Sequence, residues 1–390
     1  MYALPRELAR CYARAYTAES CERKLAGLAA IKTERWCKAG VVSTAMIDRV
    51  YAVSDVHGDA GLLLHWLVSA GLLVAEKGRY RWVNKRHALV ICGDVADDSR
   101  GDAIPDAELE RLGFEGFEGA PSGSGTWNAL AFVSYLVARC GARIVVVIGN
   151  HELMNLAQDP AMDVGKYKRR VTEAQETARG GWAAEGGMRA LLGPLLVAVC
   201  AGNLLFMHAE PPLFGPEVMF GKVHRATCLA EFTSRLNARL RASVDDPVVL
   251  TAVWGRKLGS GVTEANCETY RAFFPDVTLV RGHCPNREGA APSVNWRVFG
   301  ARNVVENTIG ADRAARVYFA RRPREMSLGA GYHGVVVSCG GDAAETFGGS
   351  VFRIDCMGSL AFGLKERESS VVAFDTAGGG VHCIVATRRG

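Results

Sequence analysis

Residues 50–59 read Val50-Tyr51-Ala52-Val53-Ser54-Asp55-Val56-His57-Gly58-Asp59. The first four residues form a short β-rich run, which favours a buried strand, and this run leads directly into carboxylate and imidazole side chains. A helical stretch follows at 60–72. Polar residues between a buried strand and a helix are typical of the crevice in which α/β proteins place their active sites.

Four further β-rich runs end in the same way, and a helical stretch at 127–140 separates the first two. Alternation of this kind predicts an α/β fold, in which the carboxyl ends of successive strands converge on one crevice. The runs are 88–91, 143–148, 204–207 and 277–280, and the polar groups after them are Gly93-Asp94, Gly149-Asn150-His151-Glu152, His208 and Gly282-His283.

The residue types in these groups are those that hold divalent metal ions. A carboxylate can bridge two ions, and imidazole and amide oxygen complete a mixed site for Mn, Fe or Zn. Two ions about 3.5–4 Å apart can clamp a phosphate and activate a water molecule. The sequence therefore predicts a binuclear metal site. Four of the nine histidines stand in these groups, namely His57, His151, His208 and His283.

The order of these groups resembles that of the calcineurin-like metallophosphoesterases. The phosphoprotein phosphatase branch of that superfamily carries Gly-Asp-x-His-Gly, Gly-Asp-x-x-Asp-Arg-Gly and Gly-Asn-His-Glu. Finer details are similar to the Shewanella-like protein phosphatases, in 149–156 (Gly-Asn-His-Glu-Leu-Met-Asn-Leu), 253–256 (Val-Trp-Gly-Arg) and 353–363. The resemblance covers about 48–364. It implies two mixed β-sheets packed as a sandwich, flanked by helices, with the binuclear site at the sandwich edge.

The resemblance also implies six metal ligands and two divalent ions, with Mn expected and Fe or Zn also compatible. In that reading Asp55 and His57 hold the first ion, Asn150, His208 and His283 hold the second, and Asp94 bridges the two.

Four further residues take catalytic roles by the same resemblance. His151 would protonate the leaving oxygen, oriented by Asp97 or Asp98. Arg100 and Arg256 would hold the phosphate oxygens, because a planar guanidinium makes bidentate contacts. A metal-bridging hydroxide would attack phosphorus in line, without a phosphoenzyme.

The chain departs from the family pattern at three places. Ser54 stands where the family has glycine, and 97–101 carries an apparent two-residue insertion before Arg-Gly. Residues 208–210 read His-Ala-Glu where the family has His-Gly-Gly. Glu210 would repel a phosphate dianion if it pointed into the site, and we expect it to point away.

Composition and charge exclude several other classes. The net charge is +5, and the basic runs 166–170 and 321–324 are short, so we expect solvated surface and no nucleic-acid partner. The apolar stretch 190–207 is interrupted by Gly193, Pro194 and Gly202, which predicts two buried strands around a turn and no membrane span.

The cysteines indicate where the protein resides. The twelve cysteines are scattered singly, without a Cys-x-x-Cys pair, and several lie in apolar runs. A free thiol in such a run behaves as a small hydrophobe. We therefore expect a reducing, intracellular compartment, the cytoplasm.

Three segments are expected along the chain. Residues 1–45 form an N-terminal helical lead-in, with helical spacing up to about residue 38. Residues 46–364 form the catalytic domain, and 365–390 form a C-terminal β extension packed on it. An acidic loop at 102–118 interrupts the alternation, and we hypothesise that it influences the choice of peptide substrate.

The resulting hypothesis is hydrolysis of phosphomonoesters on proteins, at Ser/Thr or Tyr, with a phosphorylated protein or peptide as the partner. A dinucleoside polyphosphate is the alternative substrate, as in the related symmetrical tetraphosphatases, and a phosphodiester is a third. A catalytically impaired metal-binding regulatory protein is a different class, supported by the disturbed Asp-Arg-Gly motif. The sequence leaves the oligomeric state open.

Overall fold

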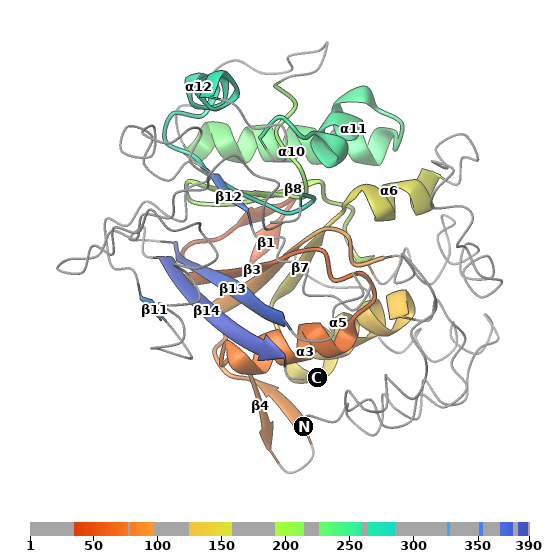
Figure 1. The fold of residues 1–390 in the computed structure, drawn as a ribbon, viewed down its shortest axis with the longest axis vertical. Coiled ribbons are helices and arrows are strands. Elements are labelled where there is room, and N and C mark those ends of the chain that lie inside the picture. The colour runs from red at the N-terminus through yellow and green to blue at the C-terminus, as the bar shows by residue number, and fades with distance from the viewer. Residues whose placement is uncertain are drawn as a thin grey trace.

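The architecture is a sandwich of two six-stranded mixed sheets with helices on both outer faces (Figure 1). A two-stranded antiparallel sheet, β4 (Leu73–Glu76) and β5 (Arg79–Trp82), lies outside it. The computed structural model describes residues 35–76, 79–96, 125–157, 192–213, 226–258, 264–284, 326–327, 351–353, 367–376 and 381–388.

The first sheet has the order β1-β2-β8-β9-β10-β12. β9 and β10 are parallel, as are β10 and β12, whereas β8 and β9 are antiparallel. Its strands are β1 (Cys37–Lys38), β2 (Val41–Val42), β8 (Ala198–Ala201), β9 (Leu204–Met207), β10 (Thr278–Arg281) and β12 (Val351–Arg353).

The second sheet has the order β11-β14-β13-β3-β6-β7. β3, β6 and β7 are parallel, and β13 pairs antiparallel with both β3 and β14. Its strands are β3 (Arg49–Val53), β6 (His87–Cys92), β7 (Ile144–Val147), β11 (Met326–Ser327), β13 (Arg367–Asp375) and β14 (Val381–Arg388).

Alternation along the strands divides the core between the two sheet faces. In β3, Val50 and Ala52 belong to the apolar cluster that both sheets share. Tyr51, between them, belongs to the cluster that includes residues of the helices. The rings of Phe206 and Phe374, one from each sheet, meet edge to face with centroids 5.9 Å apart. The apolar side chains between the two sheets therefore hold one sheet against the other.

Six helices flank the sheets within the described ranges. α10, α11 and α12 lie at the top of the view in Figure 1, α3 and α5 lie at the bottom, and α6 lies at one side. Their bounds are α3 (Ala60–Ser69), α5 (Gly125–Cys140), α6 (Asn150–Ala157), α10 (Ala226–Ala242), α11 (Pro247–Trp254) and α12 (Glu264–Phe273).

The five predicted strand runs before residue 300 are confirmed as β3, β6, β7, β9 and β10. The stretch 190–207 contains β8 and β9 around the turn at Gly202, as predicted. Among the described helices, none combines the length and the apolar character that crossing a membrane requires.

The N-terminal prediction differs from the structure at its end. Residues 1–34 lie outside the described ranges, but helical structure does not continue to residue 38, because Cys37–Lys38 and Val41–Val42 form a hairpin. Its two-residue turn is Ala39 and Gly40, at φ 52° and 88°, the left-handed backbone that tight hairpins need. At the other end of the chain, β13 lies between β14 and β3, so these strands complete the second sheet. The predicted domain boundaries stay predictions.

Candidate metal centre

The carboxyl ends of five strands meet at one edge of the sandwich. β3, β6 and β7 end there in one sheet, and β9 and β10 end there in the other. The loops after these strands and the first turn of α6 carry all six predicted metal ligands and the predicted acid, and all seven are buried. None of the seven is more than 6% exposed, and they are Asp55, His57, Asp94, Asn150, His151, His208 and His283.

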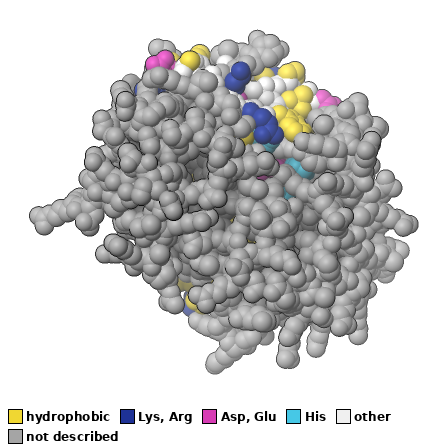
Figure 2. All heavy atoms as spheres, in the orientation of Figure 1, with side chains coloured by type: hydrophobic (Ala, Val, Ile, Leu, Met, Phe, Trp, Pro, Cys, Tyr) yellow, Lys and Arg dark blue, Asp and Glu magenta, His cyan; other side chains and the backbone are white. Residues whose placement is uncertain are grey.

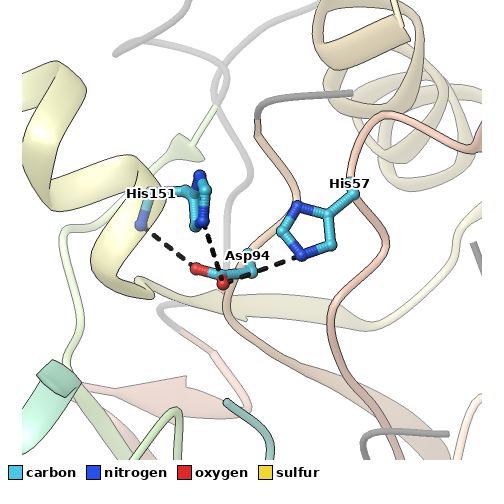
Figure 3. Close-up of side chains that lie close together, drawn as sticks. All are labelled: His57, Asp94 and His151. Atoms are coloured by element: carbon cyan, nitrogen blue, oxygen red, sulfur yellow. Dashed lines mark hydrogen bonds and ion pairs between the residues drawn. The ribbon is translucent and has the colours of Figure 1, made fainter. Parts of the chain in front are cut away.

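Asp94 lies at the centre of this cluster, and Figure 3 shows it between His57 and His151. Oδ2 lies 3.8 Å from Nε2 of His57 and 3.8 Å from Nε2 of His151. Oδ1 lies 3.3 Å from Nε2 of His208 and accepts the backbone N–H of His151 at 3.1 Å. A carboxylate with a different ligand group at each oxygen is placed to bridge two ions.

A second group of ligand atoms surrounds Nε2 of His208. Oδ1 of Asn150 lies 3.0 Å from it, Nδ1 of His283 lies 3.1 Å from it, and Oδ1 of Asp94 lies 3.3 Å from it. Asn150 comes from the first turn of α6, whereas the two histidines follow β9 and β10. The structure therefore brings the three residues predicted for the second ion to one side of Asp94.

Backbone carbonyls select the tautomer of two imidazoles. Nδ1 of His57 lies 3.1 Å from the carbonyl oxygen of Ala96, and Nδ1 of His208 lies 2.8 Å from that of Cys92. Because a carbonyl oxygen only accepts, each Nδ1 donates its proton to it. In the neutral imidazole, Nε2 then carries the lone pair, and this is the atom near Asp94.

Four of the predicted ligands adopt left-handed backbone, with φ of 55° at Asp55, 44° at His57, 52° at Asp94 and 68° at His283. For a residue with a Cβ this backbone costs about 1–3 kcal/mol, and it persists where the surroundings impose it, which is typical of functional sites. Here the loops impose it through hydrogen bonds. Asp55 donates its N–H to the carbonyl of Gly93 at 3.0 Å, and His57 donates to that of Asp94 at 2.8 Å.

Glu152 is a functional residue to which the sequence alone gave no role. It is fully buried, and its Oε2 accepts the N–H of Asp94 at 2.9 Å and that of Gly149 at 2.7 Å. Its Oε1 accepts the N–H of Ala96 at 2.7 Å. The carboxylate therefore fixes the loop after β6 to the start of α6. The only signal in the sequence was its place in the Gly-Asn-His-Glu run.

Ser54, which replaces a family glycine, contacts the ligand next to it. Its hydroxyl donates to Oδ2 of Asp55, and the same oxygen accepts the N–H of His283 at 3.1 Å. The other oxygen of Asp55, Oδ1, lies 3.9 Å from Nε2 of His57. Gly282 leaves the room for this side chain, since a Cβ there would come 2.7 Å from Cβ of Ser54. The departure from the family pattern thus adds an orienting contact.

Burial and neighbouring charges shift the pKa values of the residues in this cluster. Burial alone would raise the pKa of Asp94, but the imidazoles of His208, His151 and His57 outweigh it and hold this pKa well below its usual range. Burial would lower the pKa of His208, yet Asp94 raises it to about 9. Burial and the neighbouring His208 lower the pKa of His283 to about 2. Asp94 is therefore ionised, which is the form in which a carboxylate binds a cation.

The donor set fits divalent metal ions. Two groups of ligand atoms each lie within 4.8 Å of one another, and both groups contain Asp94. Nε2 of His283 is buried and has no hydrogen-bond partner within the described ranges. Carboxylate, imidazole and amide oxygen together suit Mn, Fe or Zn. The groups are His57, Asp94 and His151, and Asp94, His208 and His283.

Arg256, predicted to hold phosphate, lies at the edge of this cluster. Its Nη1 lies 3.9 Å from Sγ of Cys284, the residue after His283. The ring of Trp254 meets the ring of His283 edge to face, with centroids 6.0 Å apart. In the upper part of Figure 2, histidine side chains are visible beside Lys or Arg side chains and hydrophobic side chains. A cationic side chain at the rim of a metal centre is well placed to bind an anion.

The other sequence predictions have different outcomes. Asp97, Asp98 and Arg100 lie outside the described residues, as does the acidic loop at 102–118, so their roles stay predictions. Glu210 is buried, and its Oε2 accepts the N–H of Leu258 at 2.6 Å. This contact agrees with the expectation that Glu210 points away from the metal ligands.

Comparison with known proteins identifies the family. The family model for calcineurin-like phosphoesterases matches residues 48–291, more than half of the chain. No curated protein matches the chain. Among solved structures, a cold-active protein-tyrosine phosphatase of a psychrophilic Shewanella species is 17% identical, with a TM-score of 0.44 over 84% of this chain and 76% of that one. A protein serine/threonine phosphatase from Saccharomyces cerevisiae is 11% identical, with a TM-score of 0.40 over 100% of this chain and 91% of that one. A metallophosphoesterase from Sphaerobacter thermophilus is 10% identical, with a TM-score of 0.36 over 88% and 89%. The chain belongs to the calcineurin-like phosphoesterases, and it is a metal-dependent hydrolase of phosphoesters.

Proposed function

We propose that the protein is a phosphoprotein phosphatase that removes phosphate from Ser, Thr or Tyr side chains with two divalent ions, Mn²⁺ foremost. The observation that carries the proposal is the position of Asp94, whose Oδ2 lies near Nε2 of His57 and whose Oδ1 lies near Nε2 of His208. The assignment of a protein as the substrate rests on the runs 149–156 and 253–256, which resemble those of protein phosphatases.

The predicted ligands form two sets, one for each ion, and Asp94 belongs to both. Two bound ions would neutralise the phosphate oxygens and lower the pKa of a coordinated water molecule. The chain contributes ligands whose orientation is already fixed by buried hydrogen bonds, and such preorganisation is what a catalytic site requires. One ion would be held by Asp55, His57 and Asp94, and the other by Asp94, Asn150, His208 and His283.

The surroundings of His151 support a role in proton transfer. It stands in the first turn of α6, it is 1% exposed, and its ring meets that of His57 edge to face at 5.0 Å. Asp94 accepts its backbone N–H and lies 3.8 Å from its Nε2 (Figure 3). We assign to His151 the protonation of the leaving oxygen, and to Arg256 the binding of phosphate oxygens through its planar guanidinium.

The test is hydrolysis of p-nitrophenyl phosphate with added Mn²⁺. His151→Asn should lower kcat by about 10²–10⁴-fold, the usual contribution of a general acid. Asp94→Asn should abolish turnover together with Mn²⁺ binding. Asp276→Asn, at an exposed position, and His87→Asn, at the other end of β6, are the matched controls and should keep full activity. Full activity in Asp94→Asn would overturn the proposal.

The substrate class needs a separate panel. Phosphopeptides carrying phosphoserine, phosphothreonine or phosphotyrosine should be hydrolysed faster than diadenosine tetraphosphate or bis(p-nitrophenyl) phosphate. Faster hydrolysis of the tetraphosphate would replace the protein substrate by a dinucleoside polyphosphate, and preference for the diester would indicate a phosphodiesterase. Two bound Mn²⁺ ions without turnover of any substrate would indicate a metal-binding regulatory protein.

A further inference from the structure

Glu210 stands where the family pattern has a glycine, and the structure gives its carboxylate a defined place. The residue is 1% exposed, and Oε2 accepts the backbone N–H of Leu258 at 2.6 Å. The preceding residue, Ala209, donates its N–H to the carbonyl of Ala252 at 3.2 Å. The segment after β9, which begins with the predicted ligand His208, is therefore bound both to α11 and to the turn that follows this helix.

Gly255 opens that turn and leaves room for the carboxylate. A Cβ at Gly255 would lie 2.6 Å from Cδ of Glu210, closer than real Cβ atoms approach. Its backbone, at φ −60° and ψ 140°, is one that any residue can adopt. The glycine is therefore needed for space and not for conformation. The Glu210 side chain occupies this space, and its hydrogen bond to Leu258 attaches it to the turn 255–258.

The turn carries Arg256, and the guanidinium groups of Arg256 and Arg281 lie near the same sulfur atom. Nη1 of Arg256 lies 3.9 Å from Sγ of Cys284, and Nη2 of Arg281 lies 3.4 Å from the same sulfur. Arg281 is completely buried, and its Nε and Nη1 have no hydrogen-bond partner in the part of the chain that the structure describes. Burial raises the pKa of Glu210, and the charge of Arg281 opposes that rise.

We propose that Glu210 is the positioning residue of Arg256. By accepting the N–H of Leu258 next to Gly255, it fixes the turn so that the Arg256 guanidinium stays at the rim of the metal centre. The proposal rests on the proposed function in one respect, since it takes Arg256 as a ligand of phosphate. It requires that phosphate affinity depends on Glu210 only through Arg256.

The test is the Kd of inorganic phosphate, measured by calorimetry on the full chain loaded with Mn²⁺, which needs no turnover. Glu210→Ala and Arg256→Ala should each weaken phosphate binding by about tenfold, and the double variant should be no weaker than Arg256→Ala alone. The Mn²⁺ content should stay at the wild-type value in all three. Glu268→Ala, at an exposed position of α12, is the matched control. An undiminished effect of Glu210→Ala in the Arg256→Ala background would overturn the proposal.

Further variants decide the question if Glu210→Ala does not fold. Glu210→Gln keeps an acceptor for the Leu258 N–H and should retain most of the phosphate affinity, whereas Glu210→Asp is one methylene shorter and should not. In Gly255→Ala the new methyl group would crowd Cγ and Cδ of Glu210, so this substitution should also weaken phosphate binding. Equal phosphate affinity in the Gln and Asp variants would overturn the proposal.

The two proposals fail in different ways. Coupling between Glu210 and Arg256 in phosphate binding, without turnover of any ester, would support the positioning role and contradict the proposed phosphatase activity. Turnover of phosphopeptides, with strictly additive effects of the two substitutions on phosphate binding, would support the phosphatase activity and contradict the positioning role.

Discussion

The backbone N–H of Asp94 donates to Oε2 of Glu152 at 2.9 Å, across 58 positions of the chain. The same carboxylate accepts the N–H of Gly149 and of Ala96, both at 2.7 Å. The loop that carries the central carboxylate and the helix that carries His151 are therefore held in one frame. The relative position of the proposed bridging ligand and the proposed acid depends on a carboxylate that accepts backbone N–H groups from both segments.

Glu152→Gln tests this frame. An amide has one acceptor oxygen where the carboxylate has two, so at least one of the three N–H groups would face an NH₂ group. A buried donor without an acceptor costs about 1–3 kcal/mol, and we expect the free energy of unfolding to fall by that amount and Mn²⁺ affinity to fall with it. Urea denaturation and Mn²⁺ titration measure the two. Glu231→Gln, at an exposed position of α10, is the control, and unchanged Mn²⁺ affinity in Glu152→Gln would contradict the role.

Ser54→Ala should weaken metal binding without unfolding the protein. The substitution removes the hydroxyl that donates to Oδ2 of Asp55, and loss of such an orienting contact typically costs about 10–100-fold in metal affinity. Gly282→Ala should destabilise the protein, because its methyl group would crowd Cβ of Ser54. Ser54→Gly should relieve part of that loss in the double variant. The prediction is wrong if Gly282→Ala lowers the free energy of unfolding by the same amount in the wild type and in Ser54→Gly.

Removal of the metal should lower thermal stability. An ion that binds only the folded chain adds about 2.7 kcal/mol when its concentration is 100 times its Kd, so Mn²⁺ should raise Tm and EDTA should return it to the metal-free value. His283→Asn removes one ligand and should show a smaller shift. Differential scanning calorimetry of the wild type, His283→Asn and Asp94→Asn checks this. A full Mn²⁺ shift in Asp94→Asn would argue against a shared carboxylate.

The buried thiols predict a loss of stability at alkaline pH. Burial raises the pKa of Cys37 to about 12 and that of Cys200 to about 11, from 9.0. Between pH 9 and 11 the unfolded chain releases protons that the folded chain keeps, so stability falls as pH rises, by about 1.4 kcal/mol per pH unit for each thiol. Below pH 9 these thiols do not make the free energy of unfolding depend on pH. Urea denaturation at pH 8 and pH 10 should give a smaller loss for Cys200→Ala than for the wild type, and equal losses would contradict the assignment.

The strand ends could be predicted from the sequence because an apolar run stops there and polar, metal-binding residue types begin. Runs such as 88–91 and 204–207 are apolar over their whole length, as strands covered on both faces must be, and metal-capable residues follow within a few positions. The hairpin of Cys37–Lys38 and Val41–Val42 could not be predicted. Strands of two residues show no periodicity, and their pairing with β8 is a tertiary contact.

The interior of the site was predictable only in part. The residue types of the ligands indicate a metal centre, but the orientation of a side chain depends on loops that meet only in the folded chain. Glu210 and Glu152 illustrate this limit. Each is an acid close to a motif, and nothing local shows that one supports the turn 255–258 while the other binds three N–H groups around Asp94. Left-handed backbone at His57 and His283 is equally a product of the assembled loops.

The pairing of β3 with β13 has a consequence for how the protein is made. Ala52 of β3 pairs with Val372 of β13, and β3 leads directly to Asp55. A ribosome that adds about 5–20 residues per second needs about 15–60 s to travel from one strand to the other. During that time one edge of β3 has no neighbour, and an open strand edge invites pairing with other chains. The strand that leads to Asp55 therefore keeps an open edge until the C-terminal strands have been made, and the nascent chain has to be protected there against pairing with other chains.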